Sequence, residues 1–169
     1  MTVLETERLT LRPHRLSDFE DYAAMLASER SVPMGGPVDR GTAWDAFCGE
    51  VAAAQLGLGQ VWAIERRADE AHVGQVGFQQ PPSFPERELG WMLYAGFEGQ
   101  GYALEAARAA RDYGFGTLGW DDFVSYIDPD NARSVRLAEA LGGVRDADAP
   151  VPTEGDLVYR HTRPEVSPA

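Results

Sequence analysis

The chain has 169 residues, of which 44% are hydrophobic and 25% charged, a composition typical of one globular domain with a buried core. Its formal net charge of −12 argues against nucleic acid as a partner, because phosphate backbones are bound by clustered cationic side chains. No apolar run is long enough to cross a bilayer and the first residues lack a secretory signal pattern, so we expect a cytoplasmic protein without a membrane partner.

Residue types that bind metals or form disulfides are sparse. Cys48 is the single cysteine, so neither an intrachain disulfide nor a thiolate cluster can form. Because it follows Phe47 on an apolar helical face, we expect it to be a small buried hydrophobe. The histidines lie far apart in the sequence without i, i+4 pairing, so the sequence predicts no metal site. They are His14, His72 and His161.

The first third of the chain predicts one strand and two helices. Alternating polarity around Leu9 and Leu11 indicates a short strand that ends at Pro13. Residues 17–20, SDFE, have the pattern of a capping box and precede an apolar stripe of helical period. A Pro/Gly loop at 32–37 separates this helix from a second one, capped at Thr42 and Asp45. Its predicted buried stripe consists of Trp44, Phe47, Cys48, Val51 and Ala54.

Strands dominate the middle of the chain and alternate with helices after it. Short turns join the strand candidates 60–66, 72–79 and 86–94, which implies antiparallel pairing. A helix from about 103 to 113, a strand at 122–127, a helix at 131–141 and an alternating tail follow. This order predicts a single α+β (α/β) domain over 1–169, with an ordered core of about 7–164. We expect a mixed sheet of about six to seven strands with helices on both faces.

The most informative segment is the glycine turn 99–101, which lies between a predicted strand and an alanine-rich helix. Glycines permit positive φ and leave no Cβ between the turn and a ligand. The free N–H groups of the first helical turn and the positive end of the helix dipole then form a phosphate or pyrophosphate site. Ordinary tight turns share this pattern. A Rossmann fingerprint would need glycine or alanine where Leu104 stands, and the Gly-Lys-Ser/Thr of a P-loop is missing.

Three segments, in this order, carry a resemblance to a known family. They are residues 4–12, LETERLTLR; residues 88–91, ELGW, with residues 98–106, EGQGYALEA; and residues 130–134, DNARS, leading to Leu141-Gly142. Together they resemble the GNAT superfamily, in the branch similar to ribosomal-protein N-terminal acetyltransferases. In that branch the segments look like the opening strand, the fourth strand with the coenzyme A loop, and the motif after the fifth strand. The resemblance spans nearly the whole chain.

The resemblance implies a single GNAT-like domain that transfers an acetyl group from acetyl-coenzyme A to a primary amine. In this family the fourth strand splays away from the fifth, so that pantetheine pairs with the fourth strand. A backbone N–H there polarises the thioester carbonyl, and N–H groups of the glycine turn hold the pyrophosphate. The implied cofactor-binding residues are Met92, Leu93, Tyr94, Gly99, Gln100, Gly101, Tyr102, Ala103, Leu104 and Asn131. Asn131 is equally suited to capping the following helix.

Two residues are candidates for the chemistry. Glu88 would act as the general base, because an ammonium ion must lose a proton before it attacks a thioester. The alternative for Glu88 is a solvent-facing side chain or one paired with Arg87. The tyrosine acid of many family members corresponds to Ala138, so Ser134 becomes the candidate acid, with a plain helix-start serine as its alternative. No Ser-His-Asp or Cys-His spacing suggests a covalent intermediate, so direct transfer in a ternary complex is expected.

The acceptor is left open by these residues. A protein N-terminus, an amino acid, a polyamine or a drug-like amine would all fit near 34–36, Trp91 and Tyr126. Glu98 stands where the superfamily prefers Arg or Gln, so its side chain is not expected to bind phosphate. A non-catalytic coenzyme A-binding domain of the same fold is the main alternative, followed by a nucleotide-dependent oxidoreductase. A monomer and a homodimer both remain open.

Overall fold

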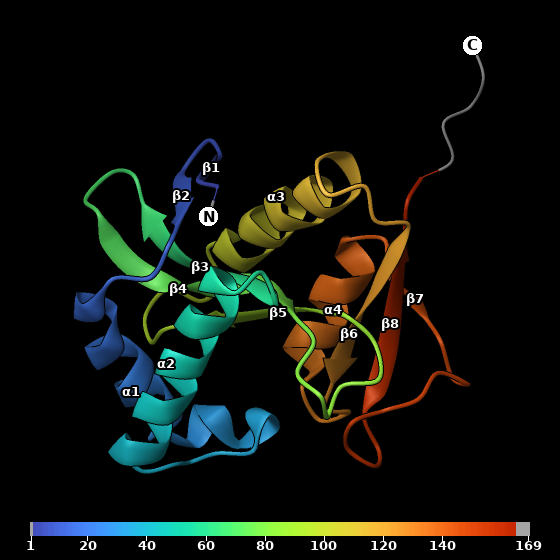
Figure 1. Cartoon of the computed structure of the whole chain (residues 1–169), viewed down its shortest axis with the longest axis horizontal. Helices are drawn as coiled ribbons and strands as arrows, with labels where there is room; N and C mark the ends of the chain where they lie inside the picture. Colours follow the sequence, from blue (N-terminus) through green and yellow to red (C-terminus); the bar gives the residue numbers. More distant parts are fainter. Residues whose placement is uncertain (1, 165–169) are drawn as a thin grey trace.

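One continuous sheet crosses the molecule in the computed structural model, which describes residues 2–164 (Figure 1). Its eight strands stand in the order β1-β2-β3-β4-β5-β6-β8-β7. The strands are β1 (Leu4–Glu5), β2 (Leu9–Arg12), β3 (Gly59–Arg66), β4 (Ala71–Gln79), β5 (Glu88–Leu93), β6 (Asp122–Ile127), β7 (Val144–Arg145) and β8 (Leu157–Thr162). The count exceeds the expected six to seven because the two-residue β1 forms an extra hairpin with β2.

The pairing of the strands confirms a mixed sheet. Strands β2 to β5 pair antiparallel in chain order, as their short connections predict. The parallel pair is β5 with β6, whose connection contains α3 (Tyr102–Gly116). This parallel pair has a single register position, Glu88 with Val124, so the two strands diverge beyond it. The expected splay is therefore present.

Two helical layers cover the sheet. On one side lie α1 (Phe19–Leu26) and α2 (Arg40–Gln55), and on the other lie α3 and α4 (Ala132–Ala140) (Figure 1). Neighbouring residues of β5 mark the division, because successive strand side chains point to opposite faces. Met92 packs in the cluster formed by α1 and α2, whereas Leu89 packs against α3. Short 3₁₀ turns, η1 (Leu16–Asp18) and η2 (Glu29–Met34), flank α1.

The helix starts before residue 45 differ from those expected. Residues 16–18 form η1, and the Asp18 carboxylate accepts a hydrogen bond from the Arg15 N–H at 2.7 Å, so no serine caps α1. The second helix begins earlier, because Asp39 Oδ1 accepts from the Thr42 N–H at 2.8 Å. The two corrections have different causes. Aspartate is as good a cap as threonine, so Asp39 can start α2 earlier. The Asp18 side chain caps no N–H of α1, because its carboxylate is held by Arg12 and Arg15.

The predicted buried stripe of α2 is wrong in part. Trp44 is 42% exposed and Cys48 is also exposed, so the cysteine is not a core residue. The helix instead turns Ala43, Phe47 and Glu50 towards the protein. Glu50 lies inside because its carboxylate accepts from Tyr22 Oη at 3.0 Å, a partner that the apolar pattern does not reveal.

Candidate active site

The turn before α3 presents backbone donors that the protein leaves free. Gly99 and Gly101 have φ of 73° and 81°, in the left-handed region that favours glycine. Within residues 2–164 the Gln100 N–H closes a turn over Glu98 and Gly99, whereas none of the N–H groups from Gly101 to Leu104 meets an acceptor. The N–H of Glu105 is the next to bond, to the Gly101 carbonyl at 3.1 Å. These residues therefore fit a pyrophosphate, because free N–H groups and the helix dipole both favour an anion.

Two arginines that sequence reasoning missed lie beside this turn. Arg8 donates from Nη1 to the Gln100 carbonyl at 2.9 Å and pairs with Glu105. The Arg66 guanidinium lies 5.3 Å from the ring centroid of Phe97. Arg8 binds the carbonyl of the turn and Arg66 stacks on the aromatic ring of Phe97 beside it, so neither side chain occupies the N–H groups of the turn. Arg8 lies in the bend between β1 and β2 and Arg66 at the end of β3, both distant in sequence from the turn, so no local pattern identifies them.

The edge of β5 that faces β6 offers a second set of free backbone groups. Near its start this edge is occupied, since the Val124 N–H donates to the Arg87 carbonyl at 3.0 Å and Ser125 Oγ to the Leu89 carbonyl at 2.7 Å. The Tyr94 N–H donates the other way, to Val73 of β4 at 2.9 Å. Because backbone groups alternate along a strand, Trp91 and Leu93 face the splayed gap.

This alternation divides the predicted pantetheine-binding stretch. Leu93 is on the open edge, whereas the backbone of Met92 and Tyr94 faces β4 and their buried side chains pack towards α1 and α2. The backbone of Trp91, a residue that the sequence suggests only for the acceptor pocket, lies on this open edge beside that of Leu93. The period-two alternation of a strand carries the signal that would have found it.

The carbonyl of Leu93 already has a partner from the protein. Arg30 of η2 donates to it from Nη2 at 2.9 Å and also pairs with Glu98. Glu98 in turn accepts from the Gly96 N–H at 2.8 Å. Glu98, which departs from the family pattern, thus stabilises the loop before the glycine turn through Arg30 and the Gly96 N–H, a role that does not involve phosphate.

Glu88 stands where the splayed gap closes. Its carboxylate accepts from Gln79 Nε2 at 3.0 Å, and burial raises its pKa to about 7 despite a hydrogen bond from the Tyr126 backbone. It is not paired with Arg87, whose guanidinium instead lies 3.8 Å from the ring centroid of Trp120. A carboxylate with a pKa near neutrality can take up a proton and release it again at pH 7.

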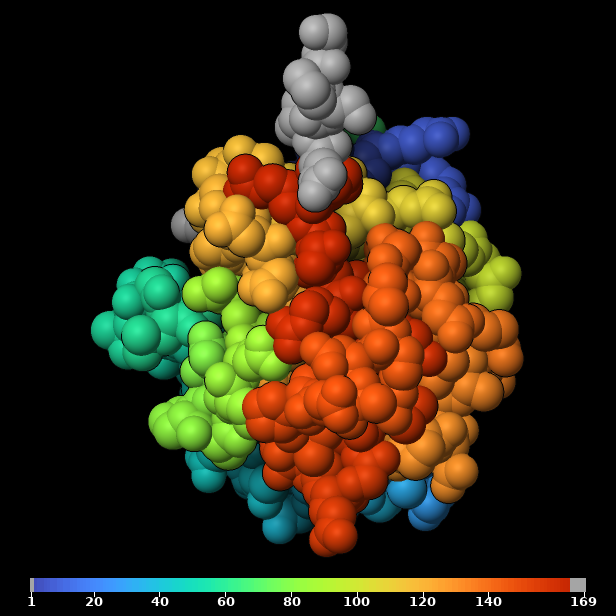
Figure 2. Space-filling view, turned by 90° about the vertical axis from the view of Figure 1, so that its right-hand side faces the viewer, coloured from blue at the N-terminus to red at the C-terminus, as the bar shows by residue number. Residues whose placement is uncertain are grey.

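A glycine two residues after Glu88 lies beside this carboxylate, at a distance where an alanine Cβ would make an ordinary contact. A Cβ added at Gly90 would lie 3.6 Å from Cδ of Glu88, so the carboxylate occupies the space above this glycine. Asp156 raises the pKa of Glu88 further through its charge. Figure 2 shows the segments 80–87, in green, and 146–156, in orange-red, side by side on the face near this end of the gap.

Ser134 and Asn131 meet at the start of α4, across the gap from β5. Trp91 Nε1 donates to Ser134 Oγ at 3.2 Å. An indole N–H can only donate, so the serine keeps its own hydroxyl proton for another acceptor. Asn131 Oδ1 accepts from the Ser134 N–H at 3.2 Å, so the asparagine does cap the helix. Its amide NH₂ remains for the predicted contact with pantetheine.

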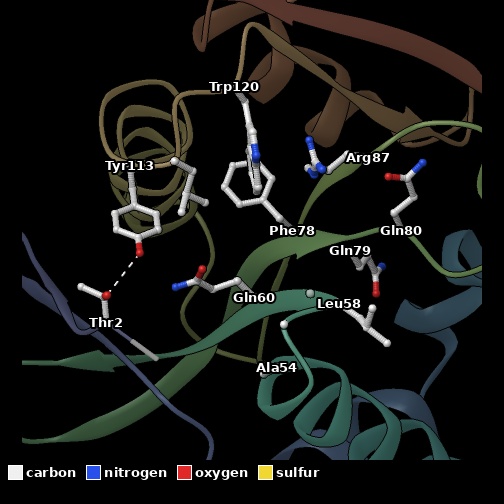
Figure 3. A pocket seen from close by; sticks show the side chains of 13 residues that line it. Thr2, Ala54, Leu58, Gln60, Phe78, Gln79, Gln80, Arg87, Tyr113 and Trp120 are labelled. Atoms are coloured by element: carbon white, nitrogen blue, oxygen red, sulfur yellow. Dashed lines mark hydrogen bonds between the residues drawn. The ribbon is translucent and has the colours of Figure 1, made fainter.

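A cavity of about 600 Å³ lies elsewhere, between the end of α2 and the end of α3 (Figure 3). Phe78, Tyr113 and Trp120 line it together with Gln60 and Arg87. It contains none of the predicted cofactor-binding residues, although Gln79, which bonds to Glu88, and Arg87, which precedes it, line the cavity. The splayed edge of β5 is therefore the candidate site.

Known proteins share both the sequence and the fold. Residues 8–144 match the family described as Acetyltransferase (GNAT) domain. The crystal structure of an acetyltransferase from Agrobacterium tumefaciens has 44% identity and a TM-score of 0.92, covering 96% of this chain and 95% of that one. RimL, a ribosomal-protein α-N-acetyltransferase solved with coenzyme A, shares the fold with 16% identity and a TM-score of 0.76, covering 95% and 98%.

Curated relatives match over shorter stretches. The uncharacterized protein YkkB of Bacillus subtilis is 38% identical over 84 residues, which are 48% of this chain and about half the length of that relative. Among residues 2–164, no helix is long and apolar enough to cross a membrane. The family match covers most of the chain, and the matched residues include the splayed strands β5 and β6 and the start of α3. The chain therefore belongs to the GNAT family of acetyltransferases.

Proposed function

We propose that the protein transfers the acetyl group of acetyl-coenzyme A directly to a primary amine in a ternary complex. One observation carries the proposal: free backbone groups lie both at the start of α3 and on the open edge of β5. At one end of that edge stands a half-buried carboxylate with a pKa of about 7. The site therefore offers three features along its length. N–H donors can bind the pyrophosphate, a strand edge can pair with the pantetheine amides, and a base lies at the far end.

Cofactor binding rests on backbone groups. The N–H groups from Gly101 to Leu104 would hold the pyrophosphate, and the edge at Trp91 and Leu93 would pair with the pantetheine amides. Asn131 would add a hydrogen bond from its amide NH₂. The bound cofactor supplies an acetyl group activated as a thioester. An N–H on the same edge would polarise the thioester carbonyl.

Two side chains would move the protons. The acceptor, with an amine pKa of roughly 8 to 10, arrives largely as an ammonium ion, and Glu88 takes its proton directly or through water. The amine nitrogen then bonds to the carbonyl carbon while the carbon–sulfur bond breaks. Ser134 Oγ gives its proton to the leaving sulfur and takes up the second proton that the nitrogen releases as it becomes an amide. The Trp91 indole holds the serine oxygen in place. These steps use no metal ion.

The acceptor is a primary amine, either a protein N-terminus or a small molecule. It would reach Glu88 from the face where the segments 80–87 and 146–156 adjoin (Figure 2). The net charge of −12 favours cationic acceptors at low ionic strength.

The test incubates the purified chain with acetyl-coenzyme A and a mixed panel of amines and peptides. We expect acetylated products by mass spectrometry and an equal amount of released thiol. Glu88→Gln serves as the low-activity control. Tight coenzyme A binding without thiol release across the panel would overturn the proposal and favour a non-catalytic coenzyme A-binding domain.

A further inference from the structure

A second polar region lies between α1, α2 and the sheet, outside the transfer site. Most of the buried side-chain atoms that lack a partner within residues 2–164 gather there. They are His14 Nδ1 and Nε2, His72 Nε2, Glu50 Oε2, Gln75 Oε1 and Tyr94 Oη. Buried polar atoms are nearly always satisfied, so such a gathering indicates a missing ligand or ordered water.

We infer that His14, Asp18 and His72, with Asp21 as a fourth ligand, form a binding site for a zinc-like divalent ion. One ligand atom from each of the first three residues lies within 4.8 Å of the others. The site would join the segment after β2, the η1–α1 turn and β4. The sequence predicted no metal site because these histidines lie far apart along the chain, but the fold brings their ring centroids to 6.4 Å.

The ligand atoms, up to 4.8 Å apart, have to move closer together to bind a tetrahedral ion. Asp18 Oδ2 lies 3.8 Å from His14 Nδ1, and Asp18 Oδ1 lies 3.8 Å from His72 Nδ1. Asp21 Oδ2 lies 3.2 Å from His72 Nδ1. Zinc bonds of about 2.0–2.1 Å place neighbouring ligand atoms roughly 3.4 Å apart. Two nitrogen and two carboxylate donors are a ligand set that zinc accepts.

The burial of His14 is an independent observation. Its side chain is 2% exposed, yet neither ring nitrogen has a partner within the described part of the chain. An imidazole buried without partners costs free energy that a metal bond would offset.

The arginine beside Asp18 limits how this carboxylate can bind. Arg12 donates to Asp18 Oδ2 at 2.7 Å and to Oδ1 at 2.9 Å, and the Arg15 N–H also donates to Oδ2. Each carboxylate oxygen accepts about two hydrogen bonds, so Oδ1 keeps one position free for the ion. His72 Nδ1 lies 3.8 Å from this oxygen, whereas the His14 ring, which lies 3.8 Å from Oδ2, has to turn towards it. The charges of Asp18, Asp21 and Arg12 sum to −1, which attracts a dication.

An ion can reach the site from solvent. A pocket of about 300 Å³ between Leu16 and α2 reaches His14, with Phe47 and Cys48 on its wall. The Asp21 side chain is also 55% exposed. The ion would tie the entry of α1 to β4, where the His72 ring packs 4.7 Å from that of Tyr94. Its role would be structural, apart from acetyl transfer.

The test uses the full chain after chelation, titrated with Zn²⁺ and with Co²⁺ as a spectroscopic probe. We expect one ion per chain, the visible absorption of tetrahedral Co²⁺, and a melting temperature about 5 °C higher at a hundredfold excess over Kd. His14→Ala and His72→Ala should abolish the spectrum. His161→Ala removes a buried histidine outside the cluster, so it should leave the spectrum unchanged.

Asp21→Asn covers the case in which the histidine variants fail to fold, because this exposed side chain contributes little to the core. We expect it to weaken Co²⁺ affinity at least about tenfold while the metal-free melting temperature stays unchanged. The inference is overturned if the wild-type chain shows no tetrahedral Co²⁺ spectrum. Equal affinity in Asp21→Asn, His14→Ala and the wild type would also overturn it. Neither measurement depends on acetyl transfer.

Discussion

Two half-buried glutamates, at the start of β5 and in the middle of α2, have nearly the same physical surroundings. Burial raises the pKa of both Glu88 and Glu50 to about 7. Each accepts a hydrogen bond from a glutamine of β4, Gln79 at 3.0 Å and Gln75 at 3.3 Å. They differ in what lies next to them: Glu88 adjoins the splayed edge of β5, and Glu50 adjoins Tyr22. A raised pKa thus identifies buried acids, and position relative to the cofactor edge identifies the candidate base.

The strongest test of the difference between Glu88 and Glu50 is to remove the charge of each side chain while keeping its shape. Glu88→Gln should lower kcat at pH 7 by about 10²- to 10⁴-fold, because the acceptor loses its base. Glu50→Gln should keep kcat within about threefold, since it removes an equivalent buried charge away from the cofactor edge. Steady-state thiol release measures both. A similar loss in the two variants would show that buried charge in general, and not Glu88, controls the rate.

The pH profile tests the same assignment. Glu88 must be ionised to accept a proton, so kcat/KM should rise with pH and level off above about 7, its folded-state pKa. An acceptor amine of low pKa keeps the titration of the substrate out of this range. In Glu88→Gln the step near pH 7 should disappear. If the step persists in this variant, another group is the base.

Ser134→Ala should have the next largest effect. We expect kcat to fall by roughly 10- to 100-fold with little change in the KM for acetyl-coenzyme A, because the proton for the leaving thiolate must come from water. Trp91→Phe is the matched variant, since it removes the indole donor and keeps the hydroxyl. It should lose less activity than Ser134→Ala. Full turnover in Ser134→Ala would leave the serine with a helix-start role only.

Gly101→Ala should weaken cofactor binding. Its φ of 81° costs an alanine about 1–2 kcal/mol, and the turn relaxes away from the geometry that aims its N–H groups. We expect the KM for acetyl-coenzyme A to rise about 5- to 30-fold. Gly119→Ala is the control, because Gly119 has a φ of 72° in a turn after α3 and should lose stability alone. Isothermal titration with coenzyme A compares the two, and equal affinities would contradict the binding role of the turn.

The smallest effect concerns stability. Glu50 has a folded-state pKa above its unfolded value, so its contribution is present below about pH 4.5 and is lost as pH rises through about 7. Glu50→Gln should therefore raise the free energy of unfolding by about 1–3 kcal/mol at pH 8, with little gain at pH 4.5. Thermal melts at the two pH values measure the difference. A larger gain in the free energy of unfolding at pH 4.5 than at pH 8 would contradict a raised pKa of Glu50 as the cause.

The parts of the site that could be predicted are encoded in short contiguous stretches. The strand, glycine turn and helix between residues 86 and 107 lie close together in sequence, so their patterns indicated both the local fold and its free N–H groups. The cluster around His14 and His72 was missed, because 58 positions separate these residues and only tertiary packing joins them. Glu50 was missed because an amphipathic reading treats glutamate as exposed.

The hydrogen bond between Trp91 and Ser134 has a consequence for how the cofactor enters. It links β5 to α4 across the diverging strands, and the indole also packs on the cluster containing Ile127 and Ala138. The width of the splayed gap between β5 and β6 is therefore fixed during folding, before any ligand binds. A preorganised slot spares the incoming arm the entropy loss of ordering protein segments, so coenzyme A should bind with little change in backbone structure.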